Sequence, residues 1–132
     1  MEKVLIIENS HMMRLFLANH LGRDYEVTTV DTTKEALQYL SEGNTPQLIV
    51  ADYYQKGSEQ FQALERMKNH MKWRNIPMIV LADNDKSEQR LEAFSMGAND
   101  CLSKPFNPIE LTFRAKNHSA KSEVQTQYRT VA

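Results

Sequence analysis

The chain has 132 residues, of which 41% are hydrophobic and 25% are charged, and its formal net charge is −1. This length suits one domain with a substantial core and excludes two such domains. Because the near-neutral charge provides no field that attracts polyanions, we expect no direct binding to nucleic acid or to a membrane surface.

Short apolar runs alternate with longer segments of helical period. Val4–Ile7 is a continuous aliphatic run, typical of a strand that is buried on both faces. In residues 10–22, apolar side chains recur at spacings of three and four, which predicts a helix ending at Gly22. These side chains are Met13, Phe16, Leu17 and Leu21. Residues 25–30 alternate in polarity and predict a second strand.

The middle of the chain repeats this pattern. Thr32 and Glu35 have the spacing of a capping box and begin a second predicted helix. Turn residues 43–46 precede a third buried strand at 48–51, which ends at Asp52. A third helix is predicted from apolar residues at helical spacing, namely Phe61, Leu64, Met67 and Met71.

The last third of the chain adds two strands and two helices. Residues 77–82 predict the fourth strand, and Asp85 with Glu88 repeats the capping-box spacing before a helix that ends at Gly97. The apolar positions of that helix are Leu91 and Phe94. Residues 100–103 predict the fifth strand, and Asn107 with Pro108 begins the last helix.

Five strands that alternate with five helices predict an α/β domain with a parallel sheet covered on both faces. The apolar run Val4–Ile7 is too short for a signal peptide or a membrane span, and the single cysteine excludes an intramolecular disulfide. We therefore expect a cytoplasmic protein without a membrane segment.

Parallel sheets place their binding sites at the carboxyl ends of the strands. The residues at these ends are Glu8, Asn9, Asp52, Ala82, Asp83 and Lys104. Two carboxylates and an amide suit a hard cation such as Mg²⁺, and a lysine beside them can hold a phosphoryl group. Polar residues also end strands simply because the loops there face water, so each residue taken singly is weak evidence.

Five segments carry a resemblance to a known family. They are Val4–Ser10, Leu48–Asp52, Ile76–Leu81, Gly97–Asp100 and Ser103–Phe106. In residue type, order and spacing they resemble the receiver domains of response regulators in bacterial two-component signalling. The resemblance implies a flavodoxin-like, doubly wound, five-stranded parallel sheet of order 2-1-3-4-5 with five helices. It assigns residues 1–118 to the receiver and residues 119–132 to a helix extension or to a linker toward an output domain outside this sequence.

The resemblance also implies roles for individual residues. Asp52 would accept phosphate from a histidine kinase or a phosphotransfer protein, and Lys104 would contact the phosphoryl group beside a cis peptide bond to Pro105. Glu8, Asn9, Asp52 and the backbone carbonyl of Tyr54 would surround Mg²⁺. Such a domain is a signalling protein and not an enzyme beyond self-phosphotransfer and autodephosphorylation. Homodimers through the fourth and fifth helices are common in the family.

Several positions depart from the family pattern, among them Glu8, which stands where Asp is commoner. Asn9 replaces the second acid of the metal site, and the lower ligand charge predicts weakened Mg²⁺ binding. Ala82 replaces the Thr or Ser whose hydroxyl holds the phosphoryl group, a hydrogen bond worth about 1.5–3 kcal/mol. Cys101 replaces the aromatic ring that moves with that hydroxyl, and we interpret the cysteine as a core residue. Both switch positions are therefore altered, while the acceptor and its lysine are kept.

Three functions follow from these observations. The first is a receiver that accepts phosphate on Asp52 but has an atypical output. The second is a pseudo-receiver that binds a protein partner without phosphorylation. The third, a flavodoxin-like cofactor binder, is disfavoured because residues 9–14 contain no glycine to form a phosphate-binding loop. Tyr54 either shields an acyl phosphate from water or covers the loop as a surface aromatic.

Overall fold

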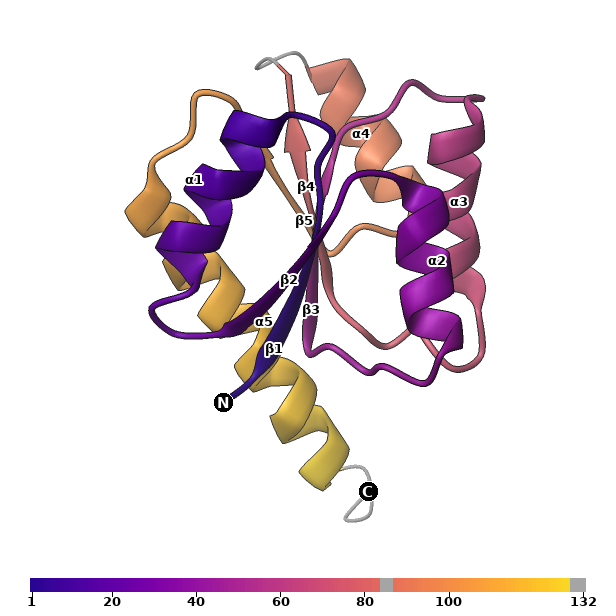
Figure 1. Cartoon of the computed structure of the whole chain (residues 1–132). Coiled ribbons are helices and arrows are strands. Elements are labelled where there is room, and N and C mark those ends of the chain that lie inside the picture. The colour runs from indigo at the N-terminus through magenta and orange to yellow at the C-terminus, as the bar shows by residue number, and fades with distance from the viewer. Residues whose placement is uncertain (84–86, 129–132) are drawn as a thin grey trace.

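A computed structural model describes the backbone of residues 1–83 and 87–128 and, within these ranges, the side chains up to Ser119. Strands and helices alternate along the chain (Figure 1). The elements are β1 Lys3–Ile7, α1 His11–Leu21, β2 Glu26–Val30, α2 Thr33–Ser41, β3 Leu48–Asp52, α3 Glu59–Asn69, β4 Met78–Ala82, α4 Ser87–Met96, β5 Asp100–Ser103 and α5 Pro108–Tyr128.

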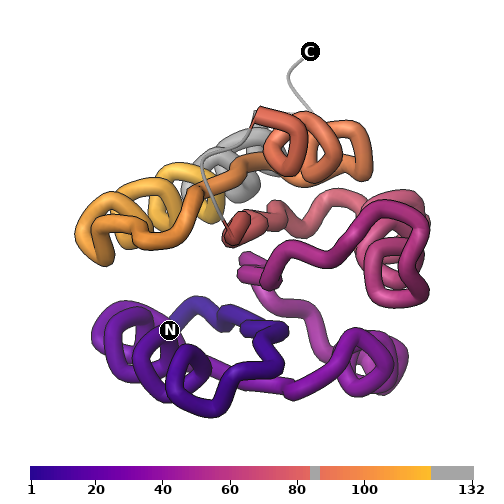
Figure 2. The backbone as a smooth tube through the Cα atoms, turned by 90° about the horizontal axis from the view of Figure 1, so that it is seen from above, coloured from indigo at the N-terminus to yellow at the C-terminus, as the bar shows by residue number. Residues whose placement is uncertain are grey.

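The strands form one parallel sheet of five strands in the order β2-β1-β3-β4-β5, which confirms the predicted fold class. Helices α1 and α5 cover one face of the sheet, and α2, α3 and α4 cover the other (Figures 1 and 2). The carboxyl ends of all strands lie at one edge, at the top of Figure 1. No helix within the described ranges is long and apolar enough to cross a bilayer.

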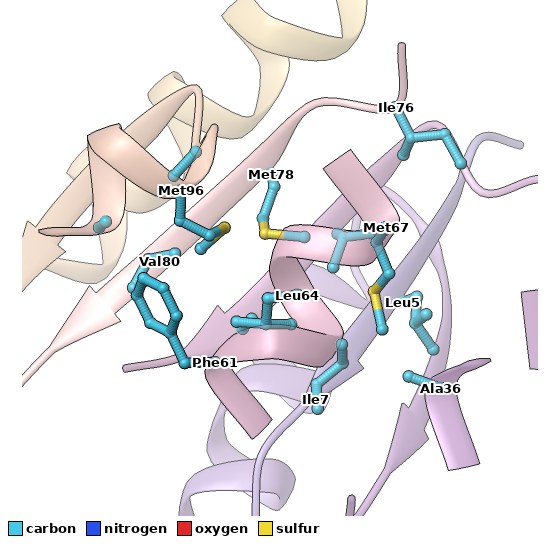
Figure 3. Packing of buried hydrophobic residues seen from close by; sticks show 14 of the residues in the cluster. Leu5, Ile7, Ala36, Phe61, Leu64, Met67, Ile76, Met78, Val80 and Met96 are labelled. Atoms are coloured by element: carbon cyan, nitrogen blue, oxygen red, sulfur yellow. The ribbon is translucent and has the colours of Figure 1, made fainter. Parts of the chain in front are cut away.

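Two apolar clusters fill the space between the sheet and its helix layers. Alternate residues of β1 enter opposite clusters: Leu5 and Ile7 face α2, α3 and α4, whereas Val4 and Ile6 face α1 and α5. Figure 3 shows how side chains of α3 and of β4 interlock in the larger cluster. Because the central strands are buried on both faces, their carboxyl ends are held in fixed positions.

Side-chain caps begin α2 and α5 where the sequence predicts them, and α1 has a cap that was not predicted. Ser10 Oγ accepts a hydrogen bond from the Met13 amide at 3.3 Å, and Thr32 Oγ1 accepts one from the Glu35 amide at 3.1 Å. Asn107 Oδ1 accepts from the amide of Ile109 at 2.8 Å at the start of α5. The predicted cap at Asp85 lies outside the described residues.

Two predictions about apolar helix faces were wrong. Helix α3 ends at Asn69, and His70 is extended with φ −76° and ψ 136°, so that Met71 lies outside the helix and is 83% exposed. Helix α4 buries Ala93 and Met96, whereas Leu91 and Phe94 are 68% and 44% exposed. Both pairs in α4 are three residues apart, so spacing alone could not determine which pair faces the core.

Gly97 confirms the predicted helix end and brings α3 close to α4. Its φ is +116°, and a Cβ atom added there would lie 2.9 Å from Lys68 Cβ. Lys68 is held firmly, because its Nζ donates to the carbonyl oxygens of Arg74 and Ile76 and to Asn99 Oδ1 at 2.8–3.0 Å. A side chain at position 97 therefore meets both an unfavourable backbone conformation and an immobile neighbour.

We expect Gly97→Ala to lower the free energy of unfolding by about 2–4 kcal/mol, since backbone strain and overpacking add. Gly57→Ala is a matched control, because Gly57 has φ +88° but nothing within 4 Å of an added Cβ. It should cost only about 1 kcal/mol. Urea unfolding of both variants measures the difference, and equal losses would contradict the close contact with Lys68.

Candidate functional site

The ammonium group of Lys104 lies among three carboxylates. Its Nζ donates to Asp52 Oδ1 at 2.9 Å and lies 3.8 Å from Glu8 Oε2 and 4.0 Å from Asp83 Oδ1. These four residues end or directly follow β5, β3, β1 and β4. The parallel sheet thus brings together Glu8, Asp52 and Lys104, as the sequence predicts, and adds Asp83, which had no assigned role.

Only one oxygen of Asp52 is held by hydrogen bonds. Oδ1 accepts from Lys104 Nζ and from the backbone N–H of Tyr53, both at 2.9 Å. Among the described residues, no donor reaches Oδ2. The carboxylate is 19% exposed, so Oδ2 is available to a ligand that approaches from the solvent. The arrangement orients the carboxylate through one oxygen and leaves the other free to react.

Glu8 is the most deeply buried acid of the site, at 2% exposure. Its Oε1 accepts from the Ser10 amide at 3.1 Å, whereas its buried Oε2 has no hydrogen-bond partner. Burial is the main reason why the pKa of Glu8 is raised above 4.5; Asp52 and Asp83 raise this pKa further, and the Ser10 N–H and Lys104 lower it. A buried, unpartnered carboxylate oxygen is costly unless a cation or a proton satisfies it.

Electrostatics keep Lys104 charged. Burial alone would lower the pKa of its ammonium group, but the hydrogen bond to Asp52 and the charges of Asp52, Glu8 and Asp83 outweigh burial and raise this pKa. When all three acids are ionised, one ammonium faces three carboxylates, which leaves two negative charges uncompensated. This excess matches the charge of a divalent cation.

Asn9 is held by a polar network that the sequence did not reveal. Its Nδ2 donates to Asp31 Oδ1 at 3.1 Å, and Arg14 Nη1 donates to the same oxygen at 3.0 Å. Arg14 also donates to the carbonyl oxygens of Glu8 and Asn9 at 2.9 and 3.0 Å. Arg14 therefore fixes the loop between β1 and α1. The position of Asp31, directly after a predicted strand, is the feature of the sequence that could have indicated that it lies near the site.

The donor set fits magnesium better than a softer metal. Within the described residues, no three His, Cys, Asp or Glu side chains form a group that could hold a metal ion by themselves. Mg²⁺ binds proteins through one or two carboxylates and keeps several waters. Glu8 and Asp52 can supply those carboxylates, and the unpartnered Oε2 of Glu8 is an atom that such an ion would satisfy. The amide nitrogen of Asn9 donates to Asp31, so Oδ1 is the side-chain atom of Asn9 that could bind a metal ion.

Tyr54 lies close to the charged groups of the site. Burial raises the pKa of its phenol, and the charges of Asp52, Glu8 and Asp31 raise it further. The ring also packs against the larger apolar cluster. The side chain is thus partly buried beside the acceptor.

The two positions interpreted from the sequence as altered switch residues are buried apolar sites. Ala82 is fully buried at the end of β4, and Cys101 is 3% exposed in β5, where burial raises the pKa of its thiol. Cys101 therefore lies in the core, as the sequence predicts. The Lys104–Pro105 peptide bond is cis, which was also expected.

An apolar groove of about 410 Å³ opens beside Lys104. Side chains of α1 and of the segment after β5 line it: Ser10, Met12, Met13, Phe16, Lys104, Pro105 and Phe106. Met12 is 81% and Phe16 is 44% exposed, so these apolar side chains line a groove that is open to solvent. It lies next to the charged site and is continuous with it through Lys104.

Comparison with known proteins gives a consistent result. The profile of the response regulator receiver domain matches residues 4–116. Histidine kinase P4 of Formosa agariphila is 31% identical over 114 residues, which are 86% of this chain and 8% of the kinase. Two-component response regulator ORR6 of Oryza sativa subsp. japonica is 29% identical over 112 residues, which are 83% of this chain and 66% of that protein.

A solved structure from Chloroflexus aurantiacus, described as a response regulator, has a TM-score of 0.82 and 30% sequence identity. The match covers 90% of this chain and 98% of that one. The chain therefore corresponds to nearly the whole of one solved structure, but to only 8% and 66% of the two proteins compared by sequence.

Replacing Lys104 should destabilise the protein in a pH-dependent way. Lys104→Met removes the cation that lowers the pKa of Glu8, so this pKa, already raised by burial, rises further above 4.5. Below pH 4.5 Glu8 is protonated in both the folded and unfolded states, so its raised pKa no longer lowers the free energy of unfolding. Above the pKa of Glu8 in the folded state, this destabilisation is fully present. We expect a loss of about 1–3 kcal/mol at pH 7 and a smaller loss at pH 4.

Urea unfolding at both pH values, without divalent cations, measures this loss. Lys116→Met is a suitable control, because Lys116 forms an exposed 3.5 Å pair with Asp24. The control should change stability by about 0–1 kcal/mol. If Lys104→Met were equally destabilising at pH 4 and pH 7, the electrostatic role of Lys104 would be contradicted.

Proposed function

Because this chain belongs to the response regulator receiver domain family, we propose that it accepts a phosphoryl group on Asp52 during two-component signalling. Receiver domains are signalling domains, and they interact with histidine kinases or phosphotransfer proteins. The observation that carries the proposal is the geometry of Asp52: Lys104 holds its Oδ1 at 2.9 Å, while Oδ2 has no donor among the described residues. One oxygen is oriented and the other can attack.

The proposed chemistry is a transfer between two nucleophiles. Oδ2 of Asp52 attacks the phosphorus of a phosphohistidine, the bond from phosphorus to the imidazole nitrogen breaks, and the imidazole leaves with its electron pair. Lys104 places positive charge against the phosphoryl oxygens without changing the orientation of the carboxylate. Glu8, Asp52, Asn9 and the backbone carbonyl of Tyr54 would hold Mg²⁺, which would supply further positive charge for the phosphoryl oxygens.

A second candidate function is a pseudo-receiver that binds its partner without phosphorylation. Asn9 favours it, because a neutral ligand lowers the charge of the proposed metal site. Ala82 and Cys101 favour it as well, because neither offers a hydroxyl to a phosphoryl group. The apolar groove beside Lys104 would serve either function as a docking surface, since it is open and adjoins the acceptor.

Incubation with acetyl phosphate and Mg²⁺ distinguishes the two candidates. We expect the intact mass to increase by one phosphate in the wild type and not in Asp52→Asn, which removes the attacking carboxylate. Asp24→Asn is the matched control, because Asp24 lies at an exposed pair with Lys116, and it should still gain the phosphate. Repeated failure of the wild type to gain mass, under conditions that phosphorylate another receiver, would support the pseudo-receiver.

The neutral ligand at position 9 yields a prediction about Mg²⁺. Asn9→Asp adds a negative ligand, so Mg²⁺ should bind about tenfold more tightly. Without Mg²⁺ the same variant should be less stable than the wild type, because its carboxylate faces Asp31 and cannot donate the present 3.1 Å hydrogen bond. Amide NMR shifts around Glu8 and Asp52 during a Mg²⁺ titration measure the affinity.

Asn69→Asp controls for the added charge, since Asn69 donates only to a carbonyl oxygen of its own helix, that of Glu65. Its Mg²⁺ affinity should equal that of the wild type. An unchanged affinity in Asn9→Asp would show that residue 9 does not face the ion.

A further inference from the structure

A hydrogen bond joins the loop that follows Asp52 to helix α4. The Tyr53 hydroxyl donates to Glu92 Oε2 at 2.5 Å, and both side chains are partly buried. Tyr53 is the first residue after β3, and Glu92 lies in the middle of α4. The bond connects residues that are 39 positions apart, so it is a tertiary contact between the acceptor loop and the helix.

The backbone of Tyr53 is tied to the acceptor itself. Its N–H is shared between Asp52 Oδ1 at 2.9 Å and the Leu81 carbonyl oxygen at 3.0 Å. One residue thus contacts the acceptor carboxylate through its main chain and α4 through its side chain. A change in the charge of Asp52 Oδ1 therefore alters the hydrogen bond that the Tyr53 N–H donates to it. The side chain of the same tyrosine is bonded to Glu92.

The phenol of Tyr53 is a permanent donor. Burial raises its pKa to about 12, and the hydrogen bond and charge of Glu92 contribute in the same direction. The hydroxyl therefore keeps its proton throughout the physiological pH range. Hydrogen bonds from a neutral hydroxyl to a carboxylate are short and strong compared with neutral pairs.

Helix α4 packs on the sheet through few buried side chains. Its buried residues are Ala93 and Met96, while Leu91, which precedes Glu92, and Phe94 are 68% and 44% exposed. The resemblance to the family assigns the connection between the acceptor and this side of the sheet to positions 82 and 101. In this chain these positions hold Ala82 and Cys101. Neither of these two side chains can form a hydrogen bond from a hydroxyl group.

We propose that the hydrogen bond between Tyr53 and Glu92 transmits the charge state of Asp52 to helix α4. This inference rests on the proposed function. Phosphorylation at Oδ2 converts Oδ1 from a charged carboxylate oxygen to the carbonyl oxygen of an acyl phosphate, which accepts a weaker hydrogen bond. The Tyr53 N–H is then held less firmly, Lys104 turns toward the phosphoryl oxygens, and the phenol carries the displacement to Glu92 and α4.

The test follows the backbone amide NMR shifts of Leu91 and Phe94 under two changes at Asp52. One change is phosphorylation with acetyl phosphate and Mg²⁺, and the other is Asp52→Asn, which removes the charge of the carboxylate without phosphate. We expect both changes to shift these amides in an otherwise wild-type chain. In Tyr53→Phe, which keeps the ring and loses the hydroxyl, we expect the shift changes to be largely lost.

Tyr39→Phe is the matched control, because Tyr39 packs against the same apolar cluster and its hydroxyl donates to Thr28 at 3.5 Å, away from α4. It should respond like the wild type. Glu92→Ala tests the bond from the other side and should also lose the response. Glu92→Gln keeps an acceptor oxygen and should restore part of it, which a merely structural role of Glu92 would not predict.

Intact mass measured on the same samples separates this inference from the proposed function. If the wild type takes up no phosphate, the proposed function fails, but the Asp52→Asn arm still tests the link. If the α4 amides respond equally in the wild type and in Tyr53→Phe, or do not respond to Asp52→Asn at all, the link is overturned. Uptake of phosphate by Tyr53→Phe without the α4 response would support the link.

Discussion

The parallel arrangement of the strands is the constraint from which the chemistry of this protein follows. All strands end at one edge of the sheet, and the residues that end or directly follow four of them place three carboxylates within 4.0 Å of a single ammonium group. No loop flexibility is needed to assemble this site, because the central strands are packed on both faces. The charge at that edge is consequently fixed by the fold, and it remains negative after Lys104 is counted.

Burial then gives the acids of the site different properties. Glu8 is buried with one unpartnered oxygen and has a raised pKa, whereas Asp52 is partly exposed and keeps one oxygen free of hydrogen bonds. The first environment favours a bound cation, and the second favours reaction with a group from solvent. The network of Arg14 and Asp31 holds the loop after β1, and the side-chain amide of Asn9 donates to this network.

The connection between the site and the helices is where the sequence predicts a departure from the family pattern. Ala82 and Cys101 fill core positions, and neither side chain carries a hydroxyl group. A tyrosine on the other side of the acceptor, Tyr53, instead reaches α4 through Glu92. In the proposed function Asp52 and Lys104 carry out the phosphate chemistry, and in the proposed link the contact of Tyr53 with Glu92 carries the signal to α4.

The sequence by itself determined the element order, the sheet class and the set of strand-end residues Glu8, Asp52 and Lys104, because buried runs and caps are local patterns. It did not determine which face of α4 is buried, since Leu91 and Phe94 have the same spacing as the residues that are buried. Nor did it reveal the contacts of Arg14 with Asp31 or of Tyr53 with Glu92. Those contacts join residues far apart along the chain, and only the packing of helices on a twisted sheet decides which distant side chains meet.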